Sequence, residues 1–247
     1  MCENDTPPEV LIHDELEPCP YLEGRTARLP MRFPFRPLSR AELDVRLAGG
    51  DRRQGTMLYR TDCPRCQACE PIRIDVTGFT PNRTQRRVLK RGDEAFRVEI
   101  GEPTVDDQRV RLYNLHKQGR RLDSGEGAID AATYQAFLVD SCCETMELRY
   151  WLGDRLAAVA VADRGLQSLS AVYCYFDPAH ARLSPGTYSV LKQIEFCRRH
   201  ALKHLYLGLY IAEAPTMAYK GNFRPHQRLI DGRWRTFHRK ATAVAQG

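Results

Sequence analysis

Hydrophobic and polar residues alternate in several short runs of this chain, which is the pattern of β-strands with one buried face. The clearest run places Leu205, Leu207, Leu209 and Ile211 on one side. The same reasoning predicts strands at 71–76, 146–152, 156–162 and 169–176.

Longer segments carry apolar residues three and four positions apart, which predicts helices with one inner face. The clearest is 186–201, where Val190, Leu191, Ile194 and Cys197 would face inward. Further helices are expected at 106–120, after a cap at Asp130, and from a cap at Thr80 or Asn82 to about Arg91, where Gly92 would end it.

The order of these elements predicts an α/β (α+β) fold, in which a mixed sheet carries packed helices. A tight turn at Asp231-Gly232 should join two final strands, because both positions tolerate positive φ. Residues 1–18 are acidic and contain prolines, which predicts a flexible leader. A smaller, cysteine-containing and basic N-terminal domain is expected at 19–95, followed by a second domain at 96–247.

Composition narrows the class of protein. Of the 247 residues, 43% are hydrophobic and 28% are charged, which is ordinary for a globular chain and unlike a disordered or fibrous one. The sequence lacks an apolar run of the roughly 18 residues that a membrane span needs. Its acidic first segment also lacks the apolar core of a signal peptide. We therefore expect a cytoplasmic protein without a membrane partner.

A basic stripe lies on the predicted helix after Asn82. Arg83, Arg86, Arg87, Lys90 and Arg91 fall at positions that share one helical face, where like charges repel each other. A polyphosphate would relieve this repulsion, which points to contact with a nucleic-acid backbone. The alternative is a solvated helix face, which charge runs usually form.

Three cysteines follow one another at metal-ligand spacing: Cys63, Cys66 and Cys69. Thiolates two residues apart can converge on one ion, and Cys19 could supply the fourth ligand for zinc or an iron–sulfur cluster. The alternative is a set of reduced thiols without a metal, because disulfides are rare in a reducing compartment.

Polar residues at the ends of predicted strands and helices form a third candidate site. Asp177 follows a strand, Gly186 and Thr187 open a helix whose free N–H groups could hold an anion, and Tyr219-Lys220 follows another strand. Each feature alone also fits an ordinary turn or helix start. Loops at strand ends are nevertheless where binding sites are often built.

These segments together resemble the bacterial branch of the arginyl-tRNA–protein transferase family, which includes the aspartate/glutamate leucyltransferases. The matching motifs run in family order over nearly the whole chain. They include Cys19-Pro20-Tyr21-Leu22, Tyr59-Arg60 through Cys69, Arg83 through Arg91, Phe176-Asp177-Pro178, Gly186-Thr187, Tyr206-Leu207-Gly208 and Met217-Ala218-Tyr219-Lys220.

The resemblance implies a GNAT-like acyltransferase fold for the second domain and an enzyme that needs no cofactor for its chemistry. Its substrates would be aminoacyl-tRNA and acceptor proteins with N-terminal Asp or Glu, which the added residue marks for degradation. DNA is not an expected partner. Leu209-Tyr210-Ile211 stands where the bacterial pattern has Tyr-Trp-Ile, and the donor stays open between leucine and arginine.

The resemblance also implies roles for individual residues. Asp177, Tyr219 and Lys220 would be catalytic: Asp177 would orient or deprotonate the acceptor amine, and Lys220 could bind an acidic acceptor side chain. Substrate contacts would come from Gly186, Thr187, Tyr173 and Tyr210, and tRNA contacts from Arg83, Arg86, Arg87, Lys90 and Arg91. Two rival interpretations remain: a non-catalytic RNA-binding protein with a cysteine-bound metal, and a coenzyme A-dependent GNAT acetyltransferase. The segment 182–187 has only part of the coenzyme A loop pattern, which disfavours the acetyltransferase.

Overall fold

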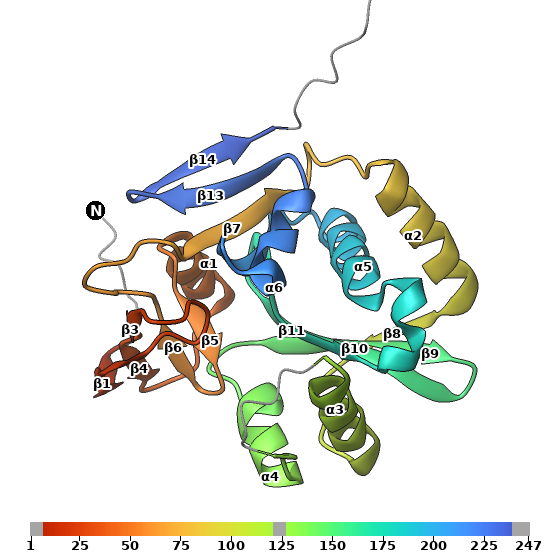
Figure 1. The fold of residues 1–247 in the computed structure, drawn as a ribbon, viewed down its shortest axis with the longest axis horizontal. Helices are drawn as coiled ribbons and strands as arrows, with labels where there is room; N and C mark the ends of the chain where they lie inside the picture. The colour runs from red at the N-terminus through yellow and green to blue at the C-terminus, as the bar shows by residue number, and fades with distance from the viewer. Residues whose placement is uncertain (1–6, 121–126, 239–247) are drawn as a thin grey trace, which may run out of the picture.

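An eight-stranded mixed sheet runs through the centre of the molecule (Figure 1). The computed structural model describes residues 7–120 and 127–238. The strands of this sheet are β7 (Glu70–Asp75), β8 (Arg97–Gly101), β9 (Thr145–Leu152), β10 (Arg155–Arg164), β11 (Ser168–Phe176), β12 (His204–Tyr210), β13 (His226–Ile230) and β14 (Arg233–Phe237). They lie in the order β14-β13-β7-β12-β11-β10-β9-β8.

Helices cover both faces of the large sheet (Figure 1). One face carries α2 (Arg83–Ala95) and α5 (Pro185–Arg199), and the other carries α3 (Asp107–Gly119) and α4 (Ala131–Tyr134), which continues as the π-helix η1 (Gln135–Val139). Strand β10 is buried between them, so Ala158 and Ala160 belong to one core while Val159 and Val161 belong to the other. The predicted α/β fold, a mixed sheet with packed helices, is therefore confirmed.

Each predicted strand lies within one or two residues of an observed one, and the turn at Asp231-Gly232 is also present, with φ of 50° and 71°. The end predicted for the basic helix is wrong. Asn82 caps α2 in a capping box with Gln85, as expected, but the helix continues through Gly92 to Ala95. A β-carbon at Gly92 would lie 2.3 Å from the Tyr188 ring, so this glycine permits the close packing of α2 on α5.

A smaller sheet lies beside the large one, formed by β1 (Glu9–His13), β4 (Met31–Pro34), β6 (Met57–Tyr59) and β5 (Arg52–Gln54). A separate pair consists of β2 (Leu16–Pro18) and β3 (Thr26–Arg28), and α1 (Arg40–Ala48) packs nearby. Residues 9–18 thus form strands where the sequence predicts a flexible leader, because β1 pairs with β4 over Glu9 to His13. The first six residues of that leader lie outside the described residues.

The segment predicted as an N-terminal domain contributes to both sheets. Strand β7 pairs with β12 and β13 in the large sheet, and α2 packs on α5. The two sheets are joined by a buried ion pair in which the Arg53 Nε lies 2.8 Å from the Asp163 Oδ2. The division into domains at 19–95 and 96–247 stays a prediction. Both segments contribute strands to the large sheet.

Strands β11 and β12 separate from each other, and this separation positions the site. In the described chain their parallel pairing covers Ser168 to Ser170 against His204 to Tyr206 and stops there. The β12 register with β7 also shifts between Tyr206 and Leu209, where Gly208 has a φ of 80°. The chain leaves β11 through a 3-10 helix, η2 (Pro178–Leu183), and returns along α5. An opening between the two strands results.

Candidate active site

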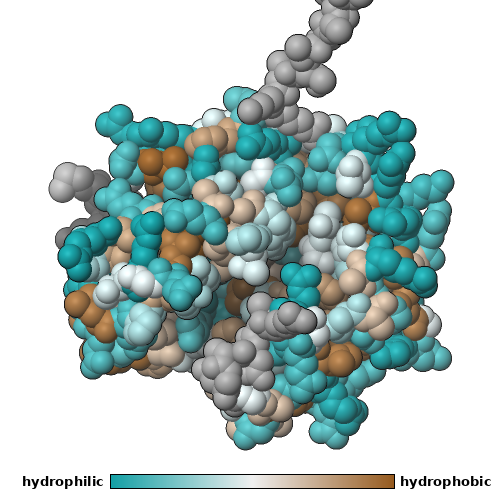
Figure 2. All heavy atoms as spheres, in the orientation of Figure 1, coloured by the Kyte–Doolittle hydropathy of each residue, from teal (hydrophilic) through white to brown (hydrophobic). Residues whose placement is uncertain are grey.

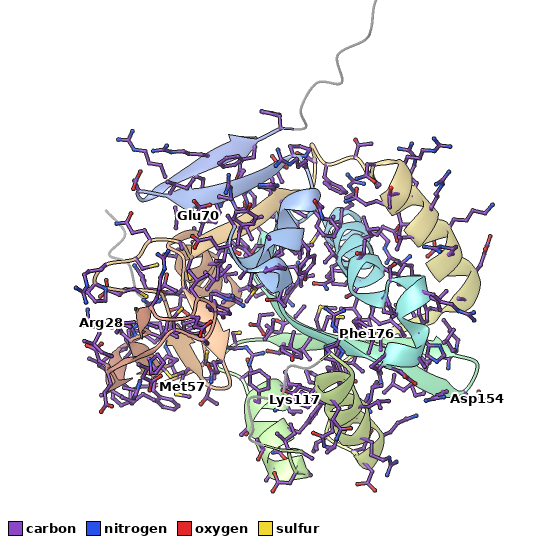
Figure 3. All side chains as sticks on the ribbon, viewed as in Figure 1. Arg28, Met57, Glu70, Lys117, Asp154 and Phe176 are labelled. Carbon is purple, nitrogen blue, oxygen red and sulfur yellow. The ribbon has the colours of Figure 1, made fainter. Side chains whose placement is uncertain are left out.

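A cavity of about 740 Å³ lies where β11 and β12 diverge. Its walls come from β11, β12, the start of α5, and the segment formed by α6 (Pro215–Ala218) and η3 (Tyr219–Asn222). Strands β5 and β6 of the small sheet close one end. Figure 2 shows a recess near the centre of this face with hydrophobic residues at its floor, and Figure 3 labels Phe176, one of the lining residues, at the end of β11.

The N-terminus of α5 faces this cavity. Pro185, Gly186 and Thr187 occupy its first turn and line the cavity. Ser184 precedes them with a φ of 55°, and its side chain caps none of the N–H groups of the helix in the described structure. The first turn of a helix leaves such N–H groups without intrahelical partners, and they favour negative charge. Gly186 and Thr187 therefore open a helix, as the sequence predicts, and their contact with substrate stays a prediction.

Lys220 is a buried amine in the wall of the cavity, at 8% exposure. Its Nζ donates a hydrogen bond of 2.8 Å to the Leu209 carbonyl oxygen and lies 3.1 Å from the Met217 Sδ. Burial lowers the pKa of Lys220 to about 7, with a smaller contribution from the nearby Arg52 cation. A substantial fraction of this amine is therefore neutral near pH 7, where its lone pair can accept a proton.

The structure brings one predicted catalytic residue, Tyr219, and one predicted substrate-binding residue, Tyr173, to the cavity. Tyr173 packs against the rings of Tyr113 and Phe137. Tyr210 is not among the lining residues that the structure describes. Its ring lies under the Arg228 guanidinium, 4.6 Å from the Arg228 Cζ, on the β13 side of the sheet.

Asp177 is also placed differently from the expectation. It is buried at the end of β11, where its Oδ2 lies 2.5 Å from the Arg155 Nη2 and its Oδ1 accepts a hydrogen bond from the Ala179 N–H. It is absent from the described lining of the cavity. These contacts make Asp177 the cap of η2, which positions the loop leading into α5. The catalytic role expected for Asp177 stays a prediction, and in this structure its carboxylate is held by Arg155 and the Ala179 N–H.

His116 and Arg52 are among the cavity residues that the sequence does not predict. His116 on α3 is buried, and its Nδ1 lies 3.2 Å from the Phe176 carbonyl oxygen. Burial lowers its pKa to about 4, so the imidazole is neutral. Arg52 on β5 lines the opposite end. His116 shares a helical face with Leu112, a signal that could have been used, whereas no pattern around Arg52 marks it.

The basic stripe lies on the exposed side of α2. All five predicted cations are exposed or half-buried, while Gln85, Val88 and Gly92 face inward. A second cavity of about 620 Å³ adjoins the N-terminus of this helix and is lined by Asn82 and Arg224 among others. It shares Thr187 and Tyr219 with the first cavity. The N-terminus of α2, where the basic stripe begins, therefore borders a second cavity that meets the first one at Thr187 and Tyr219.

The four candidate metal ligands gather in one corner of the small sheet. The Arg28 N–H lies 3.5 Å from the Cys63 Sγ, and the Arg25 Nη1 lies 3.5 Å from the Cys66 Sγ. Burial, together with the negative charges that the other three thiols would carry, raises the pKa of Cys69 to about 12. Across the described residues, no three His, Cys, Asp or Glu side chains are arranged to hold a metal. In this arrangement the thiols of Cys19, Cys63, Cys66 and Cys69 do not converge on one point, and a metal or cluster there stays a prediction.

A membrane-spanning element is likewise not found in the part of the chain that the structure describes. None of its helices has both the length and the hydrophobicity that crossing a bilayer requires. The described helices are amphipathic or short, and each packs on one of the two sheets or near the cavity.

Comparison with known proteins relates most of the chain to one family. Residues 17–87 match "Arginine-tRNA-protein transferase, N terminus", and residues 108–230 match "Arginine-tRNA-protein transferase, C terminus". An aspartate/glutamate leucyltransferase of Thiobacillus denitrificans is 39% identical over 87% of this chain and 90% of its own length. One of Chromobacterium violaceum is 37% identical over 89% and 90%.

A solved structure gives a more distant likeness. L-PGS from Bacillus licheniformis aligns with a TM-score of 0.42 and 11% identity over 58% of this chain and 45% of that chain. Nothing about the chemistry of this chain is inferred from it. The two family matches and the curated relatives, by contrast, span most of the sequence. This chain belongs to the arginine-tRNA-protein transferase family.

Proposed function

We propose that this enzyme transfers leucine from leucyl-tRNA to the N-terminal Asp or Glu of acceptor proteins and so marks them for degradation. The observation that carries the proposal is the cavity between β11 and β12, which combines a buried amine, the N-terminus of α5 and an adjoining cavity at the N-terminus of α2. The curated relatives are named aspartate/glutamate leucyltransferases, which is consistent with this assignment.

The reaction is the aminolysis of an ester. The acceptor α-amine attacks the carbonyl carbon that joins the amino acid to the 3′ end of the tRNA; a C–N bond forms and the C–O bond to the tRNA breaks. The ester is already activated, so positioning and charge stabilisation supply most of the catalysis, and the proposed steps use no cofactor. The N–H groups of Gly186 and Thr187, in the first turn of α5 at the cavity, would stabilise the oxyanion.

Lys220 is our candidate for the general base, in place of Asp177. Its neutral Nζ donates to the Leu209 carbonyl oxygen and lies beside the Met217 Sδ, and its lone pair stays available. The proton that leaves the attacking amine can pass to this lone pair and then to the 3′ oxygen of the departing tRNA. A base is most effective when its pKa lies near the working pH, and the pKa of Lys220 is about 7.

The lining of the cavity supports leucine as the donor residue. Its described part contains no Asp or Glu, and it includes apolar side chains such as Phe137, Val172 and Phe176. The guanidinium of a donor arginine would be costly to bury here without a carboxylate partner. A leucine side chain gains free energy from the same surface because its methyl groups leave water.

The proposal is tested by incubating the protein with a peptide that begins with Asp, together with leucyl-tRNA and arginyl-tRNA. Mass spectrometry of the peptide should show the addition of one leucine, and an otherwise identical peptide with an acetylated N-terminus should stay unmodified. Addition of arginine would contradict the assigned donor, and an unmodified Asp peptide with both tRNAs would contradict the assigned activity.

A further inference from the structure

Two cations of the main cavity lack an acidic partner. Arg52 and Arg120 line it, and neither of them pairs with a carboxylate within residues 7–120 and 127–238. Arg53, next along β5, shows the contrast, because Asp163 neutralises it at 2.8 Å. Charged groups in partly desolvated sites are normally paired. Unpaired cations in a cavity without described acidic residues therefore indicate an anionic ligand.

Two consecutive residues of β12, Gly208 and Leu209, contact the side chains of Arg52 and Lys220. The Lys220 Nζ donates to the carbonyl oxygen of Leu209. The Arg52 guanidinium lies against Gly208, where an added β-carbon would approach its atoms to 2.5 Å. Gly208 has a φ of 80° at the place where β12 changes register. The absence of a side chain there leaves room for the guanidinium, so the irregularity in β12 places a cation beside a base.

An N-terminal Asp or Glu matches this pair of groups. Its α-amine and its carboxylate belong to one residue and are separated by only two or three carbon atoms. We propose that Arg52 is the specificity-determining residue that holds the side-chain carboxylate of the acceptor while Lys220 receives the proton of its α-amine. This inference rests on the proposed function and assigns the acceptor subsite that the function requires.

The position of Arg52 favours the acceptor over the tRNA as the source of the anion. Arg52 lies at the end of the cavity formed by the small sheet, whereas Thr187 and Tyr219 lie at the end shared with the second cavity beside α2. Figure 1 shows β5 and α2 on opposite sides of α5 and α6. A tRNA bound along α2 would reach the site from its own side and leave the Arg52 end for the acceptor.

Electrostatics links the two groups when the acceptor binds. The field of Arg52 contributes to the lowered pKa of Lys220, after the larger effect of burial. A bound carboxylate would neutralise part of that field and raise the pKa of Lys220. An acceptor without an acidic side chain would gain neither the contact with Arg52 nor this change at Lys220. Acidic first residues are then favoured in binding.

The test compares Arg52→Gln with wild type on peptides that begin with Asp or Asn, using leucyl-tRNA as donor. Wild type should prefer Asp strongly, and Arg52→Gln should raise the KM for the Asp peptide roughly tenfold or more because a charge-assisted bidentate contact is lost. The KM for leucyl-tRNA should not change. Arg52→Lys should recover part of the preference, and Arg52→Glu should shift it towards peptides that begin with Lys.

Arg87→Gln on α2 is the matched control, and it should raise the KM for leucyl-tRNA without changing the ratio of Asp to Asn transfer. If Arg52→Gln instead raises the KM for leucyl-tRNA alone, Arg52 binds a phosphate and the proposal fails. Unchanged Asp preference in Arg52→Gln, with wild-type thermal stability, also overturns it. A wild-type protein without transfer from any charged tRNA would instead refute the proposed function, which keeps the two failures distinct.

Discussion

Among single residues, Lys220 shows how position changes chemistry. A lysine on a surface is protonated near pH 7 and cannot act as a base, whereas burial of Lys220 beside the cavity makes its neutral form accessible. The sequence points to Lys220 through the motif Met217-Ala218-Tyr219-Lys220, but as a cation for an acidic side chain. Its burial makes it a candidate general base, a role that the sequence motif does not indicate.

Replacing Lys220 with methionine should lower the transfer rate about a hundredfold, because methionine fills similar space but accepts no proton. The pH profile gives the sharper test. Below pH 7 Lys220 is protonated and inactive as a base, so the wild-type rate should rise with an apparent pKa near 7. The acceptor α-amine titrates at roughly 7.7–8 and should give a second rise.

In Lys220→Met only the rise caused by the acceptor amine should remain. Lys203→Met, at an exposed lysine outside the cavity, should keep both rises and the wild-type rate. A Lys220→Met enzyme that retains the wild-type rate and profile would remove Lys220 from proton transfer.

At the scale of secondary-structure elements, α2 has one buried face and one exposed, cationic face. Its inward positions Gln85, Val88 and Gly92 pack towards α5 and leave the cations on the outer side. The sequence predicts this face correctly, because helical spacing alone decides which residues share a side. It misplaces the end of the helix, because the contact between Gly92 and the Tyr188 ring joins residues far apart in sequence.

The double substitution Arg86→Gln/Arg87→Gln should weaken binding of leucyl-tRNA and its dependence on salt. Each lost phosphate contact should reduce the slope of log affinity against log salt by about 0.7–0.9, because fewer counterions are released on binding. Affinity measured at several salt concentrations checks this. Arg111→Gln, an exposed arginine on α3 on the other face of the sheet, should leave the slope unchanged. An unchanged slope in the double variant would exclude these two arginines from the tRNA interface.

At the scale of the whole molecule, the small sheet and the large sheet are held together by buried polar contacts. Arg53 on β5 bonds Asp163 on β10 and also donates to the Gly55 and Asp140 carbonyl oxygens. This junction keeps β5, and with it Arg52, at one end of the cavity. The active site therefore depends on how the two sheets are joined as well as on the residues that line it.

Arg53→Met should destabilise the fold by about 3–5 kcal/mol, because it leaves the buried Asp163 carboxylate without its charged partner. The free energy of unfolding in urea measures this. The double variant Arg53→Met/Asp163→Leu should be clearly more stable than the single one, since no buried charge remains. As a control, Arg235→Met at an exposed pair with Asp231 should cost less than about 1 kcal/mol. Equal loss in both single variants would contradict the structural role of the junction.

Local order along the chain was enough to predict the strands and helices of the second half, the turn at Asp231-Gly232, the α2 cap at Asn82 and the alignment of its cations. These features depend on side-chain periodicity and backbone preference within a few residues. The motifs together predicted the transferase function, because they follow the family order along the chain although each motif alone is weak evidence.

Tertiary structure decided the rest. It pairs Asp177 with Arg155 at the end of β11, and it brings Arg52 and His116 to the cavity from elements that no motif marks. It also made Lys220 a candidate base by burying it. The physical reason is that burial, electric fields and the divergence of β11 and β12 depend on contacts between segments distant in sequence. Local sequence patterns therefore cannot predict them.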